Sequence, residues 1–211
     1  MIEIVDLSFG YRRAEPVIEQ LSWCFAPGSV SGVTGRSGSG KSTLLYLIGL
    51  LLSPWSGRIV LGDEDVSAAS DSTRSQIRAR RIGFVFQDAA LDPTRAVVDN
   101  VAEGFLYSGM ERRRAIRRAH ELLQQFDVGL RAEHKPGEVS GGQAQRVALC
   151  RALLHNPRIL LADEPTGNLD VDTAAVVLSA LGSLARDQGV TVVVASHDPH
   201  VLAACDSVLA L

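Results

Sequence analysis

The sequence predicts an α/β protein built on a mostly parallel sheet. Two short runs, Ile159 to Ala162 and Val190 to Ala195, are continuously apolar, as in strands that are buried on both faces. Helical segments alternate with the predicted strands, which is typical of parallel α/β folds. The 211 residues are 46% hydrophobic and 21% charged, and this composition excludes disordered, collagen-like and disulfide-scaffold classes. We expect a single domain over residues 1–211.

The N-terminal part is predicted to be rich in strands. Ile2 to Leu7 is the first expected strand, and Ser29 to Thr34 is a second that runs into a glycine-rich turn. A buried helix is expected from Lys41 to Leu52. Arg58 to Leu61 and Ile82 to Phe86 are two further expected strands.

The middle of the chain is predicted to be helical and more charged. Helical periodicity extends from about Asp99 to Asn156, with an arginine-rich segment from Glu111 to Arg118 at its centre. The arginines are Arg112, Arg113, Arg114, Arg117 and Arg118. We expect them on a solvated helix face and expect no nucleic-acid partner, because no aromatic residues are interleaved with them and the net charge is −3. Contact with nucleic acid or lipid is the alternative.

The cysteines and the apolar runs indicate a protein of a reducing compartment. Cys24, Cys150 and Cys205 are odd in number, far apart and without metal-ligand spacing, so we expect small buried residues in a cytoplasmic protein. The most apolar stretch, Leu44 to Leu52, is much shorter than the roughly 20 residues that span a bilayer. If the protein works at a membrane, another chain must provide the span.

A glycine-rich loop between a predicted strand and a predicted helix has the form G-x-x-x-x-G-K-S. It consists of Gly35, Arg36, Ser37, Gly38, Ser39, Gly40, Lys41 and Ser42. Glycines let the backbone N–H groups turn toward phosphate oxygens, and the helix that begins near Lys41 adds its positive dipole end. We expect Lys41 to reach the β and γ phosphates of a nucleotide and Ser42 to ligate Mg²⁺. A purely structural Gly/Ser-rich loop is the alternative.

A phosphate loop of this kind requires an acidic residue at the end of a buried strand, within reach of the metal and the attacking water. Asp163 and Glu164 directly follow the run Ile159 to Ala162. We expect Asp163 to hold the metal, directly or through water, and Glu164 to polarise the water aimed at the γ phosphate. Alone, such a pair is usually a solvated strand end, so this interpretation depends on the phosphate loop.

A second candidate anion site lies between these two motifs. Val139 is followed by Ser140, Gly141, Gly142 and Gln143, which open a helix that ends near Asn156. As structure, this is a serine N-cap on a glycine-rich helix start. As a functional element, an exposed helix N-terminus made of Ser and Gly can bind a phosphate group, and it would be a second anion-binding site in this chain. One nucleotide does not need two such cradles from one subunit, which favours a dimer in which each chain closes the other chain's site.

The Ser-Gly-Gly-Gln motif before the metal-site strand resembles the signature of ATP-binding-cassette ATPases. The resemblance extends from Ile2 to Leu211 and implies nucleotide contacts from Gly35 through Thr43. It implies that Tyr11 stacks on adenine, that Gln87 senses Mg²⁺ and the attacking water, and that His197 contacts the γ phosphate. It also implies that Gly167, Asn168, Leu169 and Asp170 cross the dimer seam.

The resemblance further implies a fold and partners. The expected fold is a P-loop NTPase core with a mostly parallel sheet, an antiparallel β part near the N-terminus and an inserted α-helical subdomain of about residues 90–157. ATP and Mg²⁺ are the implied cofactors. A homodimer or heterodimer of such domains would bind an integral membrane permease and lie peripherally on the cytoplasmic side of the inner membrane. The tract from Ala162 to Asp170 resembles the branch with lipoprotein-releasing, macrolide-exporting, antimicrobial-peptide-resistance and cell-division cassettes.

Three positions depart from the family pattern. Val139 stands where leucine is usual, and Asp92 and Arg95 interrupt a mostly apolar segment that usually touches the permease. These polar residues predict either a dedicated partner or a solvated loop. The resemblance leaves three function classes open. They are the energising subunit of an exporter, a mechanical or signalling ATPase with a permease-like partner, and a soluble cassette of translation or repair. The third is disfavoured, because the chain has one cassette and no sustained heptads.

Overall fold

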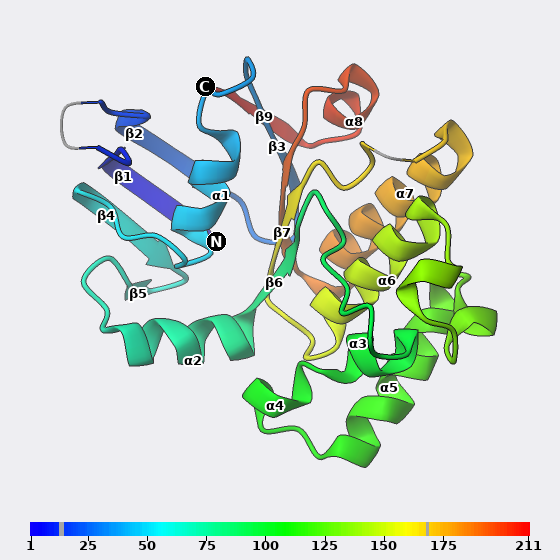
Figure 1. Cartoon of the computed structure of the whole chain (residues 1–211). Coiled ribbons are helices and arrows are strands. Elements are labelled where there is room, and N and C mark those ends of the chain that lie inside the picture. Colours follow the sequence, from blue (N-terminus) through cyan, green and yellow to red (C-terminus); the bar gives the residue numbers. More distant parts are fainter. Residues whose placement is uncertain (13–14, 168) are drawn as a thin grey trace.

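A computed structural model describes residues 1–12, 15–167 and 169–211, and Figure 1 shows its elements. At its centre lies a five-stranded sheet in the order β6-β7-β8-β3-β9. Its strands are β3 (Val30–Thr34), β6 (Ile82–Val85), β7 (Ile159–Asp163), β8 (Thr191–Ala195) and β9 (Ser207–Ala210). All four pairings in this sheet are parallel, which confirms the predicted class. Every residue of β7 and β8 is buried, as their continuous apolar runs predict.

A second, antiparallel sheet is formed near the N-terminus, as the resemblance implies. Its order is β2-β1-β4-β5. The strands are β1 (Ile2–Phe9), β2 (Ile18–Phe25), β4 (Ser56–Leu61) and β5 (Glu64–Asp65). Alternate residues of β1 face the core, so Ile2 and Ile4 are buried while Glu3 is exposed.

Helices occupy the connections between strands. The connection from β6 to β7 contains α3 (Val97–Ala102), α4 (Phe105–Ser108), α5 (Arg112–Gln125), α6 (Gly141–Leu153) and the 3₁₀ turns η1 (Gly129–Arg131) and η2 (Pro136–Glu138). The others are α1 (Lys41–Ile48), α2 (Asp71–Arg81), α7 (Val171–Gln188) and α8 (Pro199–Ala203). In Figure 1, α1 and the antiparallel sheet lie on one side of the parallel sheet, and α6 and α7 lie on the other. Among the described residues, no helix is long and apolar enough to cross a membrane.

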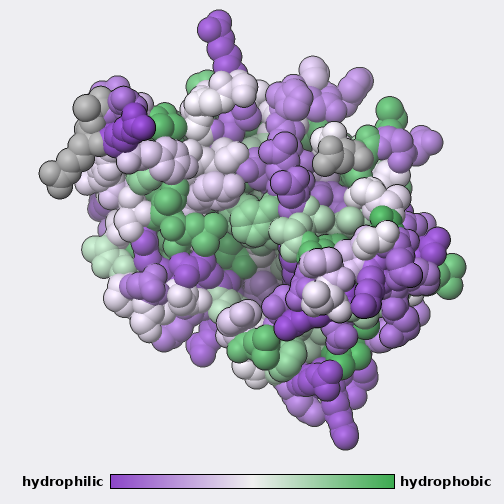
Figure 2. Space-filling model, in the orientation of Figure 1, coloured by the Kyte–Doolittle hydropathy of each residue, from purple (hydrophilic) through white to green (hydrophobic). Residues whose placement is uncertain are grey.

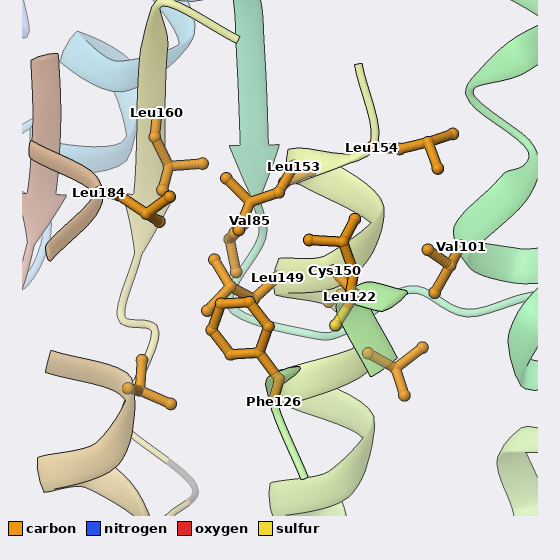
Figure 3. Packing of buried hydrophobic residues seen from close by; sticks show 14 of the residues in the cluster. Val85, Val101, Leu122, Phe126, Leu149, Cys150, Leu153, Leu154, Leu160 and Leu184 are labelled. Atoms are coloured by element: carbon orange, nitrogen blue, oxygen red, sulfur yellow. The ribbon is translucent and has the colours of Figure 1, made fainter. Parts of the chain in front are cut away.

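The parallel sheet separates two hydrophobic cores. In β7, Leu160 and Ala162 pack into the core shared with α3, α5, α6 and α7, whereas Ile159 and Leu161 pack into the core shared with α1 and the antiparallel sheet. Figure 3 shows Phe126 and residues of α6 meeting Val85 in the first of these cores. This two-sided packing fixes the carboxyl ends of β3 and β7, where the candidate site lies.

The arginine-rich segment lies at the surface, as expected. Arg112, Arg113, Arg114 and Arg117 of α5 are exposed, while the opposite face of the helix is buried. Arg118, also expected on the solvated face, is half-buried and bonds to Glu121 and Asn156. Figure 2 shows hydrophilic side chains over much of the face in view, with apolar side chains in smaller groups.

The structure corrects several expectations. The helix predicted from Lys41 to Leu52 ends at Ile48, because Gly49 caps it and Leu50 takes a left-handed conformation with φ of 57°. Strand β2 and helices α2 and α7 have no counterpart among the predicted elements. Cys24 is exposed rather than buried, because it lies on an outward-facing position of β2, whereas Cys150 is buried as expected.

Candidate functional site

The glycine-rich loop connects the end of β3 to the start of α1. Gly38 and Gly40 have φ values of 80° and 100°, a region that other residues rarely adopt. A Cβ on Gly40 would lie 2.9 Å from a methyl carbon of Val17, so a side chain there would also collide. These residues therefore bend the chain so that it arrives at α1 with the helix N-terminus pointing into the loop.

Among the described residues, the Lys41 and Ser39 side chains of this loop make no hydrogen bond to a group outside the loop. The Lys41 ammonium donates to the carbonyl oxygens of Gly35 and Arg36 at 3.0 and 3.1 Å. The hydroxyl of Ser39 is buried and makes no hydrogen bond in the described structure. Both groups are donors, so the loop holds unused capacity for an anion.

Tyr11 lies beside the helix that follows the loop. Its hydroxyl is 3.1 Å from the Thr43 hydroxyl oxygen, and its ring packs edge-on against Phe9. The residue is nevertheless 64% exposed, so much of its aromatic ring faces solvent. An exposed ring beside a phosphate loop is suited to stacking on a planar base.

Asp163 is the last residue of β7 and is buried at 3% exposure. Burial raises the pKa of its carboxyl group, and the neighbouring charge of Glu164 acts in the same direction. A hydrogen bond with Ser42 and the charge of Lys41 oppose this rise in the pKa. The structure thus brings Asp163 together with Lys41 and Ser42 of the loop, although they are more than 100 residues apart.

Glu164 begins the turn after β7 with an unusual backbone. Its φ is 46°, and its N–H donates to the Ala195 carbonyl at 2.9 Å, so the turn is tied to β8. One carboxylate oxygen accepts a hydrogen bond from His197 Nδ1 at 2.6 Å, and the other accepts one from the Ser196 hydroxyl at 3.1 Å. Because a carboxylate only accepts, Nδ1 of His197 carries the proton in this contact. Ser196 was not predicted from the sequence.

The residues of the second cradle lie at the start of α6. Ser140 caps the helix: its hydroxyl accepts from the Gln143 N–H at 3.2 Å, and the Gln143 side chain accepts from the Ser140 N–H at 3.0 Å. Ser140 and Gly141 are exposed. A Cβ on Gly142 would lie 3.3 Å from Leu169, so the start of α6 approaches the segment that leads into α7.

Asp170 caps α7 and accepts from the Thr173 N–H at 2.9 Å and from the Thr173 hydroxyl at 2.7 Å. These hydrogen bonds lower the pKa of Asp170. Asn168, which the resemblance also implies at the dimer seam, lies outside the described residues.

Gln87 is exposed in the loop after β6. The carbonyl of Phe86 accepts a hydrogen bond from Gln145, and the carbonyls of Ala89 and Ala90 accept from Arg151. Gln145 and Arg151 were missed by the sequence analysis, because nothing in a helical segment indicates which distant loop a polar side chain will reach.

The geometry therefore places most of the candidate residues in two groups, with Gln87 in the separate loop after β6. Tyr11, the glycine-rich loop, Asp163, Glu164 and His197 gather at the carboxyl ends of β3, β7 and β8. Ser140 and Asp170 belong to the starts of α6 and α7. Within the described residues, the hydrogen bonds of Ser140 go to Gln143 and Ala144 at the start of α6 and do not reach the phosphate loop.

A scan against protein-family models matches residues 18–167 to the family described as ABC transporter. The chain belongs to the ABC transporter family. It is 44% identical over 196 residues to "Lipoprotein-releasing system ATP-binding protein LolD 2" of Caulobacter vibrioides, covering 93% of this chain and 86% of that protein. It is 40% identical to the macrolide export ATP-binding/permease protein MacB of Syntrophobacter fumaroxidans, covering 95% of this chain and 29% of that longer protein.

A solved structure supports the same assignment of this ABC ATPase. The dimeric post-hydrolysis state of the ATP-binding cassette MJ0796, bound to ADP and Pi, superposes with a TM-score of 0.93 and 33% sequence identity. The match covers 100% of this chain and 94% of that one. The family, the fold and ATP hydrolysis are thus confirmed, as is the branch that the tract from Ala162 to Asp170 indicates.

Proposed function

We propose that this ABC ATPase binds and hydrolyses ATP on the cytoplasmic side of the inner membrane to power the export or extraction of a lipoprotein-like substrate through a separate permease. The observation that carries this proposal is the meeting of Lys41, Ser42 and Asp163 at one end of the parallel sheet. The identity to a lipoprotein-releasing ATP-binding protein supports the substrate class. Residues 1–211 form one ATPase domain, and residues from about 90 to 157 form its inserted helical subdomain.

The phosphate loop binds the nucleotide through its backbone and through Lys41. On ATP binding, the Lys41 ammonium exchanges the carbonyls of Gly35 and Arg36 for phosphate oxygens, and the unpartnered Ser39 hydroxyl gains an acceptor. Ser37, Gly38, Gly40 and Thr43 complete the cradle. Tyr11 stacks on the adenine, which its exposed ring supports.

Mg²⁺ is the proposed cofactor, and the residues fit it. Ser42, Asp163 and Gln87 all offer oxygen atoms, which are the ligands that Mg²⁺ prefers. Asp163 is buried with a raised pKa, so a cation beside it stabilises its ionised form. When bound, Mg²⁺ neutralises charge on the phosphate oxygens.

Glu164 polarises the attacking water, and His197 contacts the γ phosphate. The hydrogen bonds from Ser196 and His197 fix the Glu164 carboxylate, and with one carboxylate oxygen held at 2.6 Å the side chain is positioned before ATP arrives. Because the Nδ1–H of His197 donates its hydrogen bond to Glu164, the Nε2 atom is the one that remains for contact with the phosphate.

Two subunits close each ATP site. Ser140 and Gly141 are exposed at a helix N-terminus and do not bond to the phosphate loop of their own chain. In the dimer, the Ser140 hydroxyl and the Gly141 and Gly142 amides of one chain face the γ phosphate on the other, Gln143 holds Ser140 in place, and Asp170 lies at the seam. Homodimers and heterodimers fit this arrangement equally.

The permease docks beside the Gln87 loop, which we define as residues 86–96. Asp92 and Arg95 form an ion pair at 3.2 Å, and the Arg95 guanidinium also lies 3.4 Å from Glu103. A groove of about 310 Å³ adjoins them and is lined by both charged and apolar residues, including Phe105 and Leu106. Mixed lining of this kind suits a short amphipathic segment of the permease.

The experiment that tests this function is ATP-driven pairing. In Glu164→Gln protein, where hydrolysis is blocked, ATP should convert monomer to dimer in sedimentation, because two nucleotides bridge two faces, and ADP should not. Adding Ser140→Arg should abolish pairing and leave ATP binding to the monomer nearly intact. If ATP-loaded Glu164→Gln protein stays monomeric at high concentration, with and without the permease, the shared site is wrong.

A further inference from the structure

The Gln87 loop is attached to α6 by two side chains that the proposed function does not use. Gln145 is buried on α6, and its amide donates to the Phe86 carbonyl at 3.3 Å. Arg151, further along α6, donates to the carbonyls of Ala89 and Ala90 at 2.7 and 2.8 Å. Arg151 lies six positions after Gln145, which corresponds to about 9 Å along a helix, so the loop runs beside α6 in the direction of the helix.

Arg151 holds the backbone of the loop through hydrogen bonds and does not form a surface ion pair. The Arg151 guanidinium donates to two adjacent carbonyls of one loop, and among the described residues it forms no ion pair within 4.0 Å. Its burial lowers its pKa, with Glu103 opposing this at longer range. One of the two acceptors, Ala90, has a φ of 47°, a conformation that alanine rarely adopts unless its surroundings enforce it.

The same helix carries the second phosphate cradle at its N-terminus. Ser140 caps α6, and the body of α6 packs through Leu149, Cys150 and Leu153 into the core shared with β6 (Figure 3). One helix thus joins Ser140 at its N-terminus to the loop carbonyls that Gln145 and Arg151 hold.

We infer that Arg151, assisted by Gln145, is a positioning residue that fixes the Gln87 loop to the helix capped by Ser140, so that engagement of Ser140 sets the position of Gln87. This inference rests on the roles proposed above for Gln87 and Ser140. In this role Arg151 acts through the loop carbonyls that it holds, not on the nucleotide or the metal.

The test compares Arg151→Met with Arg146→Met in the full-length chain. Arg146 is a matched control, because it lies on the same helix and also donates to carbonyls, but those of Phe126 and Asp127 outside the Gln87 loop. Arg151→Met removes both hydrogen bonds from the guanidinium, so it should raise hydrogen–deuterium exchange in residues 86–96 and lower kcat about tenfold or more, since one bond from a charged donor is already worth about tenfold. KM for ATP should stay within about twofold. Arg146→Met should leave both the exchange in residues 86–96 and kcat unchanged.

Two further variants separate positioning from folding. Arg151→Lys keeps a cationic donor and should restore part of kcat, which a loss of folded protein would not explain. The inference is overturned if Arg151→Met leaves exchange in residues 86–96 unchanged, if Arg146→Met lowers kcat equally, or if Arg151→Lys restores nothing. Full ATPase activity in Gln87→Ala would instead refute the proposed role of Gln87, and raised exchange in Arg151→Met would still support the attachment.

Discussion

Glu164→Gln tests whether Glu164, next to the metal-binding Asp163 at the end of β7, polarises the attacking water. The carboxylate of Glu164 accepts one hydrogen bond on each oxygen, from His197 at 2.6 Å and from Ser196 at 3.1 Å. A glutamine amide has one acceptor oxygen and one donor nitrogen, so it keeps at least one of these contacts, and it keeps both if the Ser196 hydroxyl turns to accept from the nitrogen. It cannot polarise water as a carboxylate does. The variant therefore removes the general base and at most one hydrogen bond.

The two losses differ in size. Loss of a positioned general base costs about 10²- to 10⁴-fold in rate, which corresponds to about 3–5 kcal/mol of barrier. Loss of one hydrogen bond to a charged group costs about 1.5–3 kcal/mol when no other donor replaces it, or roughly 10- to 150-fold in rate. The loss of the base outweighs the structural change, so we expect hydrolysis to fall by about 10²-fold or more while ATP affinity, which depends on Lys41 and the loop, is retained.

Ser196→Ala provides the matched comparison. It removes the 3.1 Å hydrogen bond to Glu164 and the one that the Ser196 hydroxyl accepts from the Asp198 N–H, and it leaves both the carboxylate and its contact with His197. The rate of ATP hydrolysis, measured as released phosphate, should fall by about tenfold, and nucleotide titration should again give unchanged affinity. If Ser196→Ala is as inactive as Glu164→Gln, the position of the Glu164 side chain matters more for the rate of hydrolysis than its basicity does. If Glu164→Gln hydrolyses ATP at the unmodified rate, another group polarises the water.

Three further changes test other parts of the site. Lys41→Ala should weaken ATP binding, since each charge-assisted hydrogen bond to phosphate contributes about 1.5–3 kcal/mol; unaltered affinity in a titration would contradict the phosphate loop. Charge reversal of Asp92 and Arg95 should spare basal ATPase activity and reduce co-purification with the permease; the opposite pattern would refute the docking surface. Asp163→Asn should abolish Mg²⁺-dependent hydrolysis and raise the melting temperature at neutral pH. The second effect follows from the raised pKa of Asp163 in the folded protein: the stabilising contribution of this carboxyl group is present below its ordinary pKa and is lost as the pH rises through the folded value. A melting temperature that falls would show that the ionised carboxylate stabilises the fold.

The parts of the fold that can be predicted from the sequence are the elements in which every residue is buried. All residues of β7 and β8 are buried, so their apolar runs identify them directly. In β2, by contrast, only Ile18 and Phe25 are buried, and bulges interrupt its register with β1. Helix α2 buries little more than Arg74 and Ile77 and is attached by arginine hydrogen bonds to Ser53 and to the Leu50 and Leu52 carbonyls. Such tertiary contacts leave no periodic pattern in the sequence.

The predictable parts of the site are those that a local motif contains. The phosphate loop and the Asp163-Glu164 pair are contiguous stretches whose backbone chemistry can be read directly. Ser196, Gln145 and Arg151 act instead on residues 32, 59 and 62 positions away, and each is an ordinary residue in its own segment. Only the packing of β7 against β8 and of α6 along the Gln87 loop gives them a role.

The conformation of Glu164 explains how two adjacent acids serve different purposes. Neighbouring residues of a strand point to opposite faces, and two carboxylates this close repel each other, as the effect of Glu164 on the pKa of Asp163 shows. The left-handed φ of Glu164 ends the strand between them and sends the second carboxylate to Ser196 and His197, while the first stays beside Ser42. A non-glycine residue in this conformation carries a strain of about 1–3 kcal/mol, which persists only where surrounding contacts enforce it. The hydrogen bond from the Glu164 N–H to Ala195 is such a contact, so β8 holds the turn that keeps the metal ligand and the water-polarising group apart.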